Sequence, residues 1–139
     1  MYDFKVSEII RQPNDIISSR FEDLSGNVPI YQAGQFLTLV FQFDEREVRR
    51  SYSFSSSPAV DEPLEITIKR VENGEISRLL HHQLKVGDII QVMEPQGLFV
   101  YEPVVDSHRT VFLFAAGVGI TPLYAILKTA LVSEKSPKL

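Results

Sequence analysis

Six short segments that alternate between apolar and polar residues limit this chain to a small, mainly β structure. Turn residues separate them, as in Gln12-Pro13-Asn14 and Val86-Gly87-Asp88. Because the segments follow one another closely, they favour an antiparallel barrel or sandwich over an alternating α/β fold. We expect strands over residues 4–11, 16–21, 35–43, 47–55, 64–69 and 89–93.

A single helix is expected among these strands, over residues 77–84. Leu79, Leu80 and Leu84 give this stretch an apolar stripe at helical spacing. Neighbouring His81 and His82 point in different directions on such a helix and form a poor metal pair. We therefore expect them, and His108, to be surface or hydrogen-bonded histidines, and we predict no metal site.

The chain changes character after about residue 101. Residues 102–108 resemble a linker, and residues 110–116 form a nearly unbroken apolar run, as a buried parallel strand requires. A glycine turn at Gly117-Val118-Gly119 and a helix over residues 123–132 follow. Strand, glycine turn and helix together make the first unit of a doubly wound nucleotide-binding domain.

One such unit cannot bury both faces of its strand. It therefore either packs against the barrel or exposes apolar surface and self-associates. We expect the chain to be a fragment of a longer protein, and a natural short subunit is the alternative.

Composition excludes several classes of function. The 139 residues carry a net charge of −4 and contain no cysteine. Zero cysteine excludes disulfides, thiolate catalysis and cysteine-ligated zinc or iron–sulfur clusters within this chain. Without a Lys/Arg-rich run or a long apolar run, neither nucleic acid nor a membrane is the expected partner. A cytoplasmic location is the default expectation.

The segment over residues 50–56 combines a cation, an aromatic ring and hydroxyls. On a strand, Arg50 and Tyr52 project to the same side. A guanidinium can fork onto phosphate oxygens, and a tyrosine two residues on can cover a flat ring. Ser53 keeps its backbone groups and hydroxyl near the edge of such a ring. The alternative is an ordinary strand with a solvated Arg50.

A second candidate lies between an expected strand and helix, where Ile68 and Lys69 lead through Gly74 to Ser77. Free N–H groups and the helix dipole make a helix N-terminus an anion site. Ser77 either caps the helix or hydrogen-bonds a phosphate.

The glycine turn before residue 123 is a third candidate. Gly117 and Gly119 follow a strand-like run and precede a helix, which is the arrangement of a phosphate-binding turn. Thr121 can offer its hydroxyl to a bound ring. Pro122 suits the first turn of a helix, where its missing N–H has no partner to lose.

Together, these segments resemble the ferredoxin–NADP reductase superfamily. More narrowly, the chain is similar to reductase components of bacterial multicomponent oxygenases, in particular the phenylacetyl-CoA epoxidase reductase type. The matching motifs occur in the family's order: Arg50-x-Tyr52-Ser53-x-x-Ser56, Gly74-x-x-Ser77, Pro95-x-Gly97-x-Phe99 and Gly117-x-Gly119-Ile120-Thr121-Pro122.

The resemblance implies a six-stranded antiparallel Greek-key barrel with one capping helix over residues 1–105. It also implies the first β-α unit of a truncated α/β NAD(P)H-binding domain over residues 106–139. The implied cofactor is FAD, with FMN as the alternative. In the full protein, FAD would accept hydride from NAD(P)H and pass single electrons onward. The acceptor would be an iron–sulfur domain, a ferredoxin-like protein or an oxygenase component.

The resemblance also assigns roles to individual residues. Tyr52 would stack on the flavin, Ser53 would lie near its hydride-accepting atom, and Thr121 would lie where nicotinamide approaches. These three are the expected catalytic residues. The full set of expected cofactor-binding residues is Arg50, Tyr52, Ser53, Ser56, Ile68, Lys69, Gly74, Glu75, Ile76, Ser77, Gly117, Gly119 and Thr121.

Two other hypotheses remain open on the sequence. The chain can be a flavin-binding or docking module without its own NAD(P)H oxidation activity, and a homodimer through the truncated domain is then an option. Alternatively, the barrel holds another ligand, as riboflavin-synthase-like or lumazine-binding proteins do. That hypothesis leaves the turn at Gly117 and Gly119 without an explanation.

Overall fold

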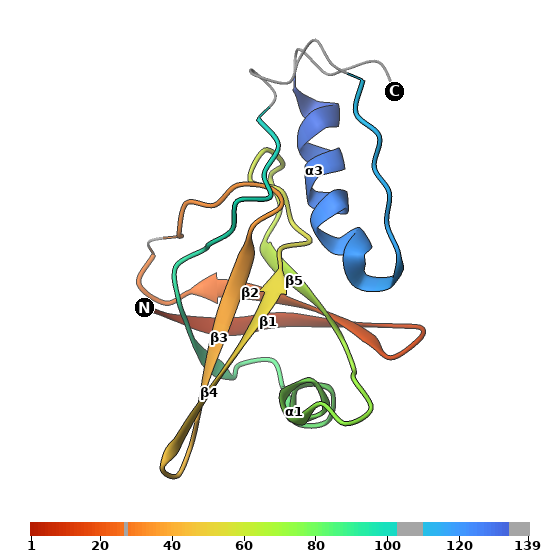
Figure 1. The fold of residues 1–139 in the computed structure, drawn as a ribbon. Coiled ribbons are helices and arrows are strands. Elements are labelled where there is room, and N and C mark those ends of the chain that lie inside the picture. The colour runs from red at the N-terminus through yellow and green to blue at the C-terminus, as the bar shows by residue number, and fades with distance from the viewer. Residues whose placement is uncertain (27, 103–109, 134–139) are drawn as a thin grey trace.

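The computed structural model describes residues 1–26, 28–102 and 110–133 (Figure 1). Most of the expected linker, including His108, lies outside these ranges. The elements, in chain order, are β1 (Tyr2–Gln12), β2 (Ile16–Asp23), β3 (Phe36–Phe43), β4 (Arg46–Ser53), β5 (Leu64–Lys69), α1 (Glu75–Gln83), β6 (Ile89–Val92), the 3₁₀ turn η1 (Gly117–Gly119) and α3 (Ile120–Val132).

The six strands form one antiparallel sheet in the order β4-β3-β6-β1-β2-β5. All six predicted strands are confirmed, with ends that differ by at most a few residues, as is usual for strand boundaries. The alternation of apolar and polar residues was sufficient to find them because each strand buries one face.

The two edge strands, β4 and β5, meet at one point. Phe54 and Ile66 form an isolated antiparallel bridge, and the Ser55 N–H donates to the Glu65 carbonyl at 2.9 Å. On the other side of the bridge from this hydrogen bond, β4 and β5 diverge in Figure 1. The sheet therefore curls into a barrel without a continuous closing ladder. We call this junction the seam.

The main core lies inside the curled sheet. Its fully buried side chains come from both halves of the sheet and include Val6, Leu37, Leu39 and Ile66. Helix α1 lies across one end of the barrel (Figure 1) and buries Ile76 and Leu80 in the same core. This helix begins two residues earlier than predicted, because Gly74 rather than Ser77 is its N-cap.

Helix α3 packs on the barrel through a second, smaller core. Buried Ala33 and Tyr101 meet Leu123 and Ile126 of the helix there. The helix predicted over residues 123–132 is confirmed and begins slightly earlier, at Ile120. Pro122 lies in its first turn, as expected.

Two polar contacts add to this packing. The hydroxyls of Ser57 and Thr129 lie 2.7 Å apart, and Lys128 pairs with Glu62. These contacts join the C-terminal half of α3 to the loop that follows the residue 50–56 segment. Within the described ranges, no helix combines the length and apolar character needed to cross a membrane.

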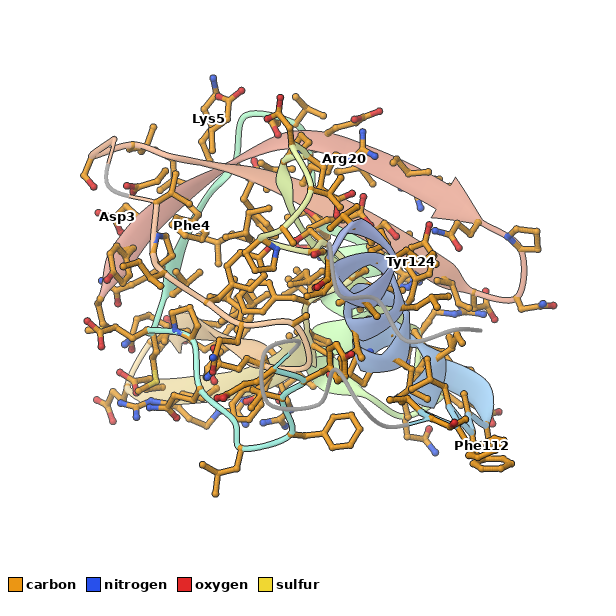
Figure 2. The ribbon with its side chains drawn as sticks, turned by 90° about the horizontal axis from the view of Figure 1, so that it is seen from above. Asp3, Phe4, Lys5, Arg20, Phe112 and Tyr124 are labelled. Atoms are coloured by element: carbon orange, nitrogen blue, oxygen red, sulfur yellow. The ribbon has the colours of Figure 1, made fainter. Side chains whose placement is uncertain are left out.

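The prediction of a buried strand over residues 110–116 is wrong. Residues 110–116 have no regular secondary structure, and Phe112 and Phe114 are 74% and 86% exposed. Figure 2 shows the Phe112 ring at the periphery of the molecule. A parallel strand needs neighbours to complete its hydrogen-bond ladder, and the described residues contain no parallel strand beside this run.

Candidate functional site

A pocket of about 290 Å³ opens at the seam, between the diverging edge strands and the start of α3. Edge strands carry backbone N–H and C=O groups that are not used by the sheet, so a ligand there meets both side chains and backbone. The lining residues are Ser51, Tyr52, Ser53, Thr67, Lys69, Val71, Val118 and Thr121.

Tyr52 supplies the aromatic surface of this pocket. It lies opposite Leu37 in the β3–β4 register and packs partly against the main core. Burial raises its pKa to about 12, while the nearby charge of Arg50 acts in the opposite direction. The phenol is therefore neutral at physiological pH, and its ring is held in place beside the pocket.

The first turn of α3 supplies the opposite wall. Gly117 has a φ of +56°, a left-handed conformation that favours glycine, and it turns the exposed segment into the helix. Thr121 is 95% buried and reaches the pocket together with Val118. A Cβ built on Gly117 or Gly119 would meet nothing within 4 Å, so the space in front of this turn is open to a ligand.

Arg50 lies on β4 two residues before Tyr52 and is exposed. Its guanidinium donates to the carbonyl of Arg49 at 2.7 Å. Arg49 pairs with Glu47 and Arg46 pairs with Glu75, whereas no described carboxylate lies within ion-pair distance of Arg50. Among the three arginines of β4, Arg50 is therefore the one that is available for an anion.

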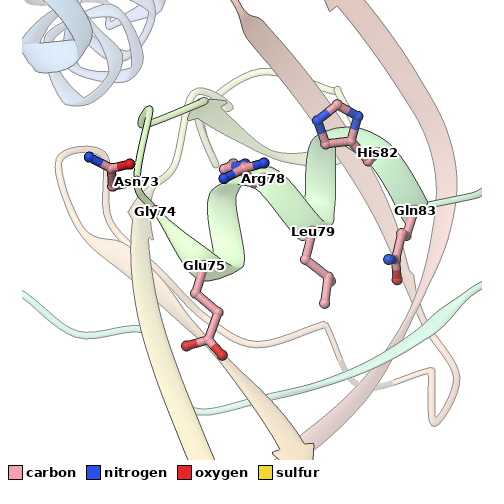
Figure 3. Close-up of a pocket in the computed structure, with 7 residues that line it drawn as sticks. All are labelled: Asn73, Gly74, Glu75, Arg78, Leu79, His82 and Gln83. Atoms are coloured by element: carbon pink, nitrogen blue, oxygen red, sulfur yellow. The ribbon is translucent and has the colours of Figure 1, made fainter.

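The start of α1 lies at the far end of β4, where Arg46 contacts Glu75. Tyr52 lies six positions after Arg46 on the strand, or about 20 Å away at the usual rise per residue. Figure 3 shows a second pocket along the exposed side of this helix, from Asn73 to Gln83. The aromatic pocket, Arg50 and a helix N-terminus thus follow one another along a single strand.

Ser77 does not cap α1, since Gly74 is the N-cap. Its Oγ accepts the Val71 N–H at 3.0 Å and donates to the Gly74 carbonyl at 3.5 Å. It therefore closes the turn before α1 and is not the N-cap, and its expected hydrogen bond to a phosphate stays a prediction. A Cβ on Gly74 would collide with this Oγ and with Val71, which explains the glycine.

Other expected site residues lie away from the pocket. Ile68 and Ile76 are core residues, and the Ile68 carbonyl lies 3.2 Å from Nε2 of buried His81. Ser56 is fully buried, and its hydroxyl lies 2.8 Å from that of Tyr31. Their side chains are therefore not presented to a ligand, and exposed Glu75 is engaged with Arg46.

The pocket also contains residues that we did not predict, namely Ser51, Thr67, Val71 and Val118. Thr67 could have been found, because it lies two residues before Lys69 and shares its face of the strand. Val118 could not, since its position depends on how α3 packs. The described residues contain no group of three potential metal ligands among His, Cys, Asp and Glu.

Known proteins resemble this chain in both sequence and structure. Residues 4–101 match the family model described as the oxidoreductase FAD-binding domain. Over 142 residues, the chain is 37% identical to a flavohemoprotein of Candida albicans, covering 99% of this chain and 35% of that protein. It is also 37% identical to the ferredoxin reductase component of 3-ketosteroid-9-alpha-monooxygenase from Mycolicibacterium smegmatis, covering 93% of this chain and 37% of that protein.

Among solved structures, the flavohem-like FAD/NAD binding domain of nitric oxide dioxygenase from Vibrio cholerae aligns with a TM-score of 0.83 and 29% identity. The alignment covers 98% of this chain and 60% of that one. Phthalate dioxygenase reductase, at 23% identity and a TM-score of 0.67, shares the fold. The chain spans about one third of the length of the curated relatives that it matches. By its matched residues and its fold, the chain belongs to the oxidoreductase FAD-binding domain family of the ferredoxin–NADP reductase superfamily.

Proposed function

We propose that this chain binds FAD along β4 and forms the flavin-binding part of an NAD(P)H-dependent reductase. The observation that carries the proposal is the order of groups along that strand. Tyr52 borders the pocket, Arg50 follows without a carboxylate partner among the described residues, and the N-terminus of α1 lies at the far end. An aromatic ring joined to phosphates matches this order.

The residues present fit the cofactor. A neutral, partly buried tyrosine suits a flat heteroaromatic ring, and an exposed guanidinium suits phosphate oxygens. The first N–H groups of α1, at Glu75, Ile76 and Ser77, have no intrahelical acceptor and favour an anion. Of the expected side chains, Ser56 and Ile68 support the fold around this site.

Three residues would act closest to the chemistry. Tyr52 covers the ring, Ser53 offers its hydroxyl and backbone at the ring edge, and Thr121 shapes the side that nicotinamide would approach. Bound FAD supplies two-electron acceptance from NAD(P)H and one-electron donation to a partner. The protein contributes binding, orientation and the exclusion of water.

For the whole protein, we propose residues 1–105 as the flavin domain and residues 106–139 as the start of an NAD(P)H-binding domain. The acceptor would be an iron–sulfur protein or an oxygenase component, supported by relatives whose names include such systems. The expected cytoplasmic location stays a prediction from the sequence.

A docking module without NAD(P)H oxidation is the second candidate. The exposed rings of Phe112 and Phe114 favour it, because they form an apolar surface beside the pocket turn. On this hypothesis, a partner protein or a second copy of the chain covers this apolar surface. Reduction of bound FAD by NADH at an enzymatic rate, with this chain alone, would exclude it.

The first experiment is an absorption spectrum of the purified chain, followed by chromatography of the heat-released cofactor. FAD is the expected product. FMN would keep the ring pocket and the role of Arg50 toward a phosphate, and would change the identity of the cofactor. No flavin, even after reconstitution with excess FAD, would contradict the proposal.

The second experiment compares two neighbouring arginines. Arg50→Ala should weaken FAD binding by about 2–4 kcal/mol, the scale of a lost charge-assisted contact. Arg49→Ala is the matched control, because Arg49 is already paired with Glu47. Calorimetry with FAD measures both. Equal affinity in the two variants would show that Arg50 does not bind the phosphate.

A further inference from the structure

Three polar side chains form a hydrogen-bond chain from the surface of the barrel to the seam pocket. Nε2 of Gln12, at the end of β1, donates to Oγ of Ser18 at 2.9 Å. The Ser18 Oγ lies 3.0 Å from Oγ1 of Thr67. Ser18 and Thr67 are direct partners in the β2–β5 register, and Thr67 lines the pocket.

The direction of this chain follows from its donors. The amide nitrogen of Gln12 has protons and no acceptor capacity, so the Ser18 oxygen accepts from it. Ser18 is 98% buried and has no access to solvent, so its single hydroxyl proton is directed to Thr67. The Thr67 oxygen is then an acceptor toward Ser18, and its own proton is free for the pocket.

This arrangement distinguishes Thr67 from the neighbouring pocket hydroxyl of Ser51. The Ser51 Oγ lies 2.9 Å from the Thr38 Oγ1, and either hydroxyl can donate there. Nothing else in that pair sets a direction. Thr67, in contrast, lies beside a buried serine that already accepts from Gln12 and has its own proton left to donate.

We propose that Thr67 donates a hydrogen bond to an acceptor atom of the flavin ring, and that Ser18 and Gln12 are positioning residues that set this polarity. The proposal rests on FAD binding in the seam pocket. The oxidised flavin ring presents its carbonyl oxygens and the nitrogens N1 and N5 as acceptors, and only N3–H as a donor. A hydroxyl of fixed polarity selects for them and against a donor group at the same position.

The decisive variant lies on the surface, away from the pocket. In Gln12→Glu, the new carboxylate accepts only, so Ser18 must donate to it and Thr67 must donate to Ser18. The pocket then meets an oxygen lone pair in place of a proton. FAD affinity should fall about tenfold, the scale of one lost hydrogen bond. Gln12→Lys keeps a donor at this position and should retain the affinity.

Matched controls separate polarity from charge. Gln83→Glu and Gln83→Lys make the same charge changes at an exposed residue of α1 that does not line the seam pocket. Thr67→Val removes the hydroxyl and should cause a loss similar to that of Gln12→Glu, while Thr67→Ser should restore binding. In the Thr67→Val background, Gln12→Glu should have no further effect, because both changes act through one hydroxyl.

Two readouts are needed, namely FAD affinity by fluorescence titration and the position of the flavin absorption bands. Urea unfolding of each apo variant shows whether the barrel is intact. A Gln12→Glu effect equal to that of Gln83→Glu, or one that persists in Thr67→Val, would overturn the proposal. If the unsubstituted chain fails to bind FAD, the proposed function itself fails. FAD binding with no Gln12 effect removes only the inference about Thr67.

Discussion

Large apolar side chains are buried in the curled sheet but exposed in the C-terminal segment over residues 110–116. Leu37 and Leu39 of β3 are completely buried, whereas Phe112 and Phe114 are mostly exposed. Both regions are apolar in sequence. The sheet residues have neighbouring strands and α1 to cover them, and the C-terminal run has no such cover among the described residues. Burial therefore depends on available partners as much as on hydrophobicity.

Helix α3 shows the same contrast across its own two faces. Leu123 and Ile126 pack against Ala33 and Tyr101 of the barrel. On the other face, Tyr124 and Leu131 are 50% and 53% exposed, and Figure 2 shows Tyr124 on this helix. One face belongs to the folded unit that we describe, and the other offers a surface for further contacts.

The largest expected effect is on the free energy of unfolding, and it should differ between the core of the sheet and the C-terminal segment. Leu39→Ala should lower the free energy of unfolding by about 2–5 kcal/mol, because it leaves a cavity in a packed core. Phe114→Ala should change it by less than about 0.5 kcal/mol. Urea unfolding followed by circular dichroism measures both. Similar values for the two variants would mean that Phe114 is buried in solution.

The second prediction concerns alkaline pH. Burial raises the pKa of Tyr31, a residue of the main core, to about 12, against 10 when unfolded. The unfolded chain thus loses this proton first. The contribution of Tyr31 to the free energy of unfolding is complete below about pH 10 and is lost as the pH rises through 12. The free energy of unfolding should fall by about 2–3 kcal/mol over this range.

Unfolding titrations between pH 9 and 12 test this prediction. Tyr31→Phe should flatten the alkaline decline, with loss of the Ser56 hydrogen bond at neutral pH. Tyr124→Phe, on the exposed face of α3, is the control. An unchanged alkaline slope in Tyr31→Phe would show that another group causes the decline.

A third prediction tests the attachment of α3. The side chains of Lys128 and Glu62 are only 17% and 24% exposed, and Glu62 also accepts the Ser57 N–H at 2.6 Å. Lys128→Met should therefore destabilise α3 by about 1 kcal/mol. Hydrogen exchange should accelerate in α3 and stay unchanged in β3. Lys5→Met, which breaks an exposed pair with Glu22, is the control.

The smallest effect on stability is expected for the exposed rings. Replacing Phe112 and Phe114 together by serine should leave unfolding nearly unchanged and should reduce any concentration-dependent self-association. Sedimentation velocity at several concentrations measures this. Ile30→Ser, at an exposed site on another loop, is the control. Equal self-association in both variants would place the contact elsewhere.

The sheet was predictable because its information is local. Each strand buries one face, so alternation with a period of two marks all six strands and their order in the chain. The seam, in contrast, depends on how far the two edge strands, β4 and β5, separate after the Phe54–Ile66 bridge. No local pattern encodes that separation, and Val118 could not be predicted as a pocket residue because its place depends on how α3 packs.

The candidate site was predicted in part. Of the expected site residues, Tyr52, Ser53, Lys69 and Thr121 line the same pocket. The motif at residues 74–77 identified the right helix, but Gly74 rather than Ser77 is its N-cap. Ser77 closes a turn because the Val71 N–H faces it, and that approach follows from the path of the chain after β5.

By itself, the sequence determined the six strands, both helices and the residue types that a flavin-binding domain needs. Periodicity, glycine turns and motif spacing carry that information within a few residues. Tertiary structure alone decided which of those residues face one pocket, which lie in the core, and that residues 110–116 stay exposed. Those outcomes depend on contacts between segments far apart in the chain, which no local pattern contains.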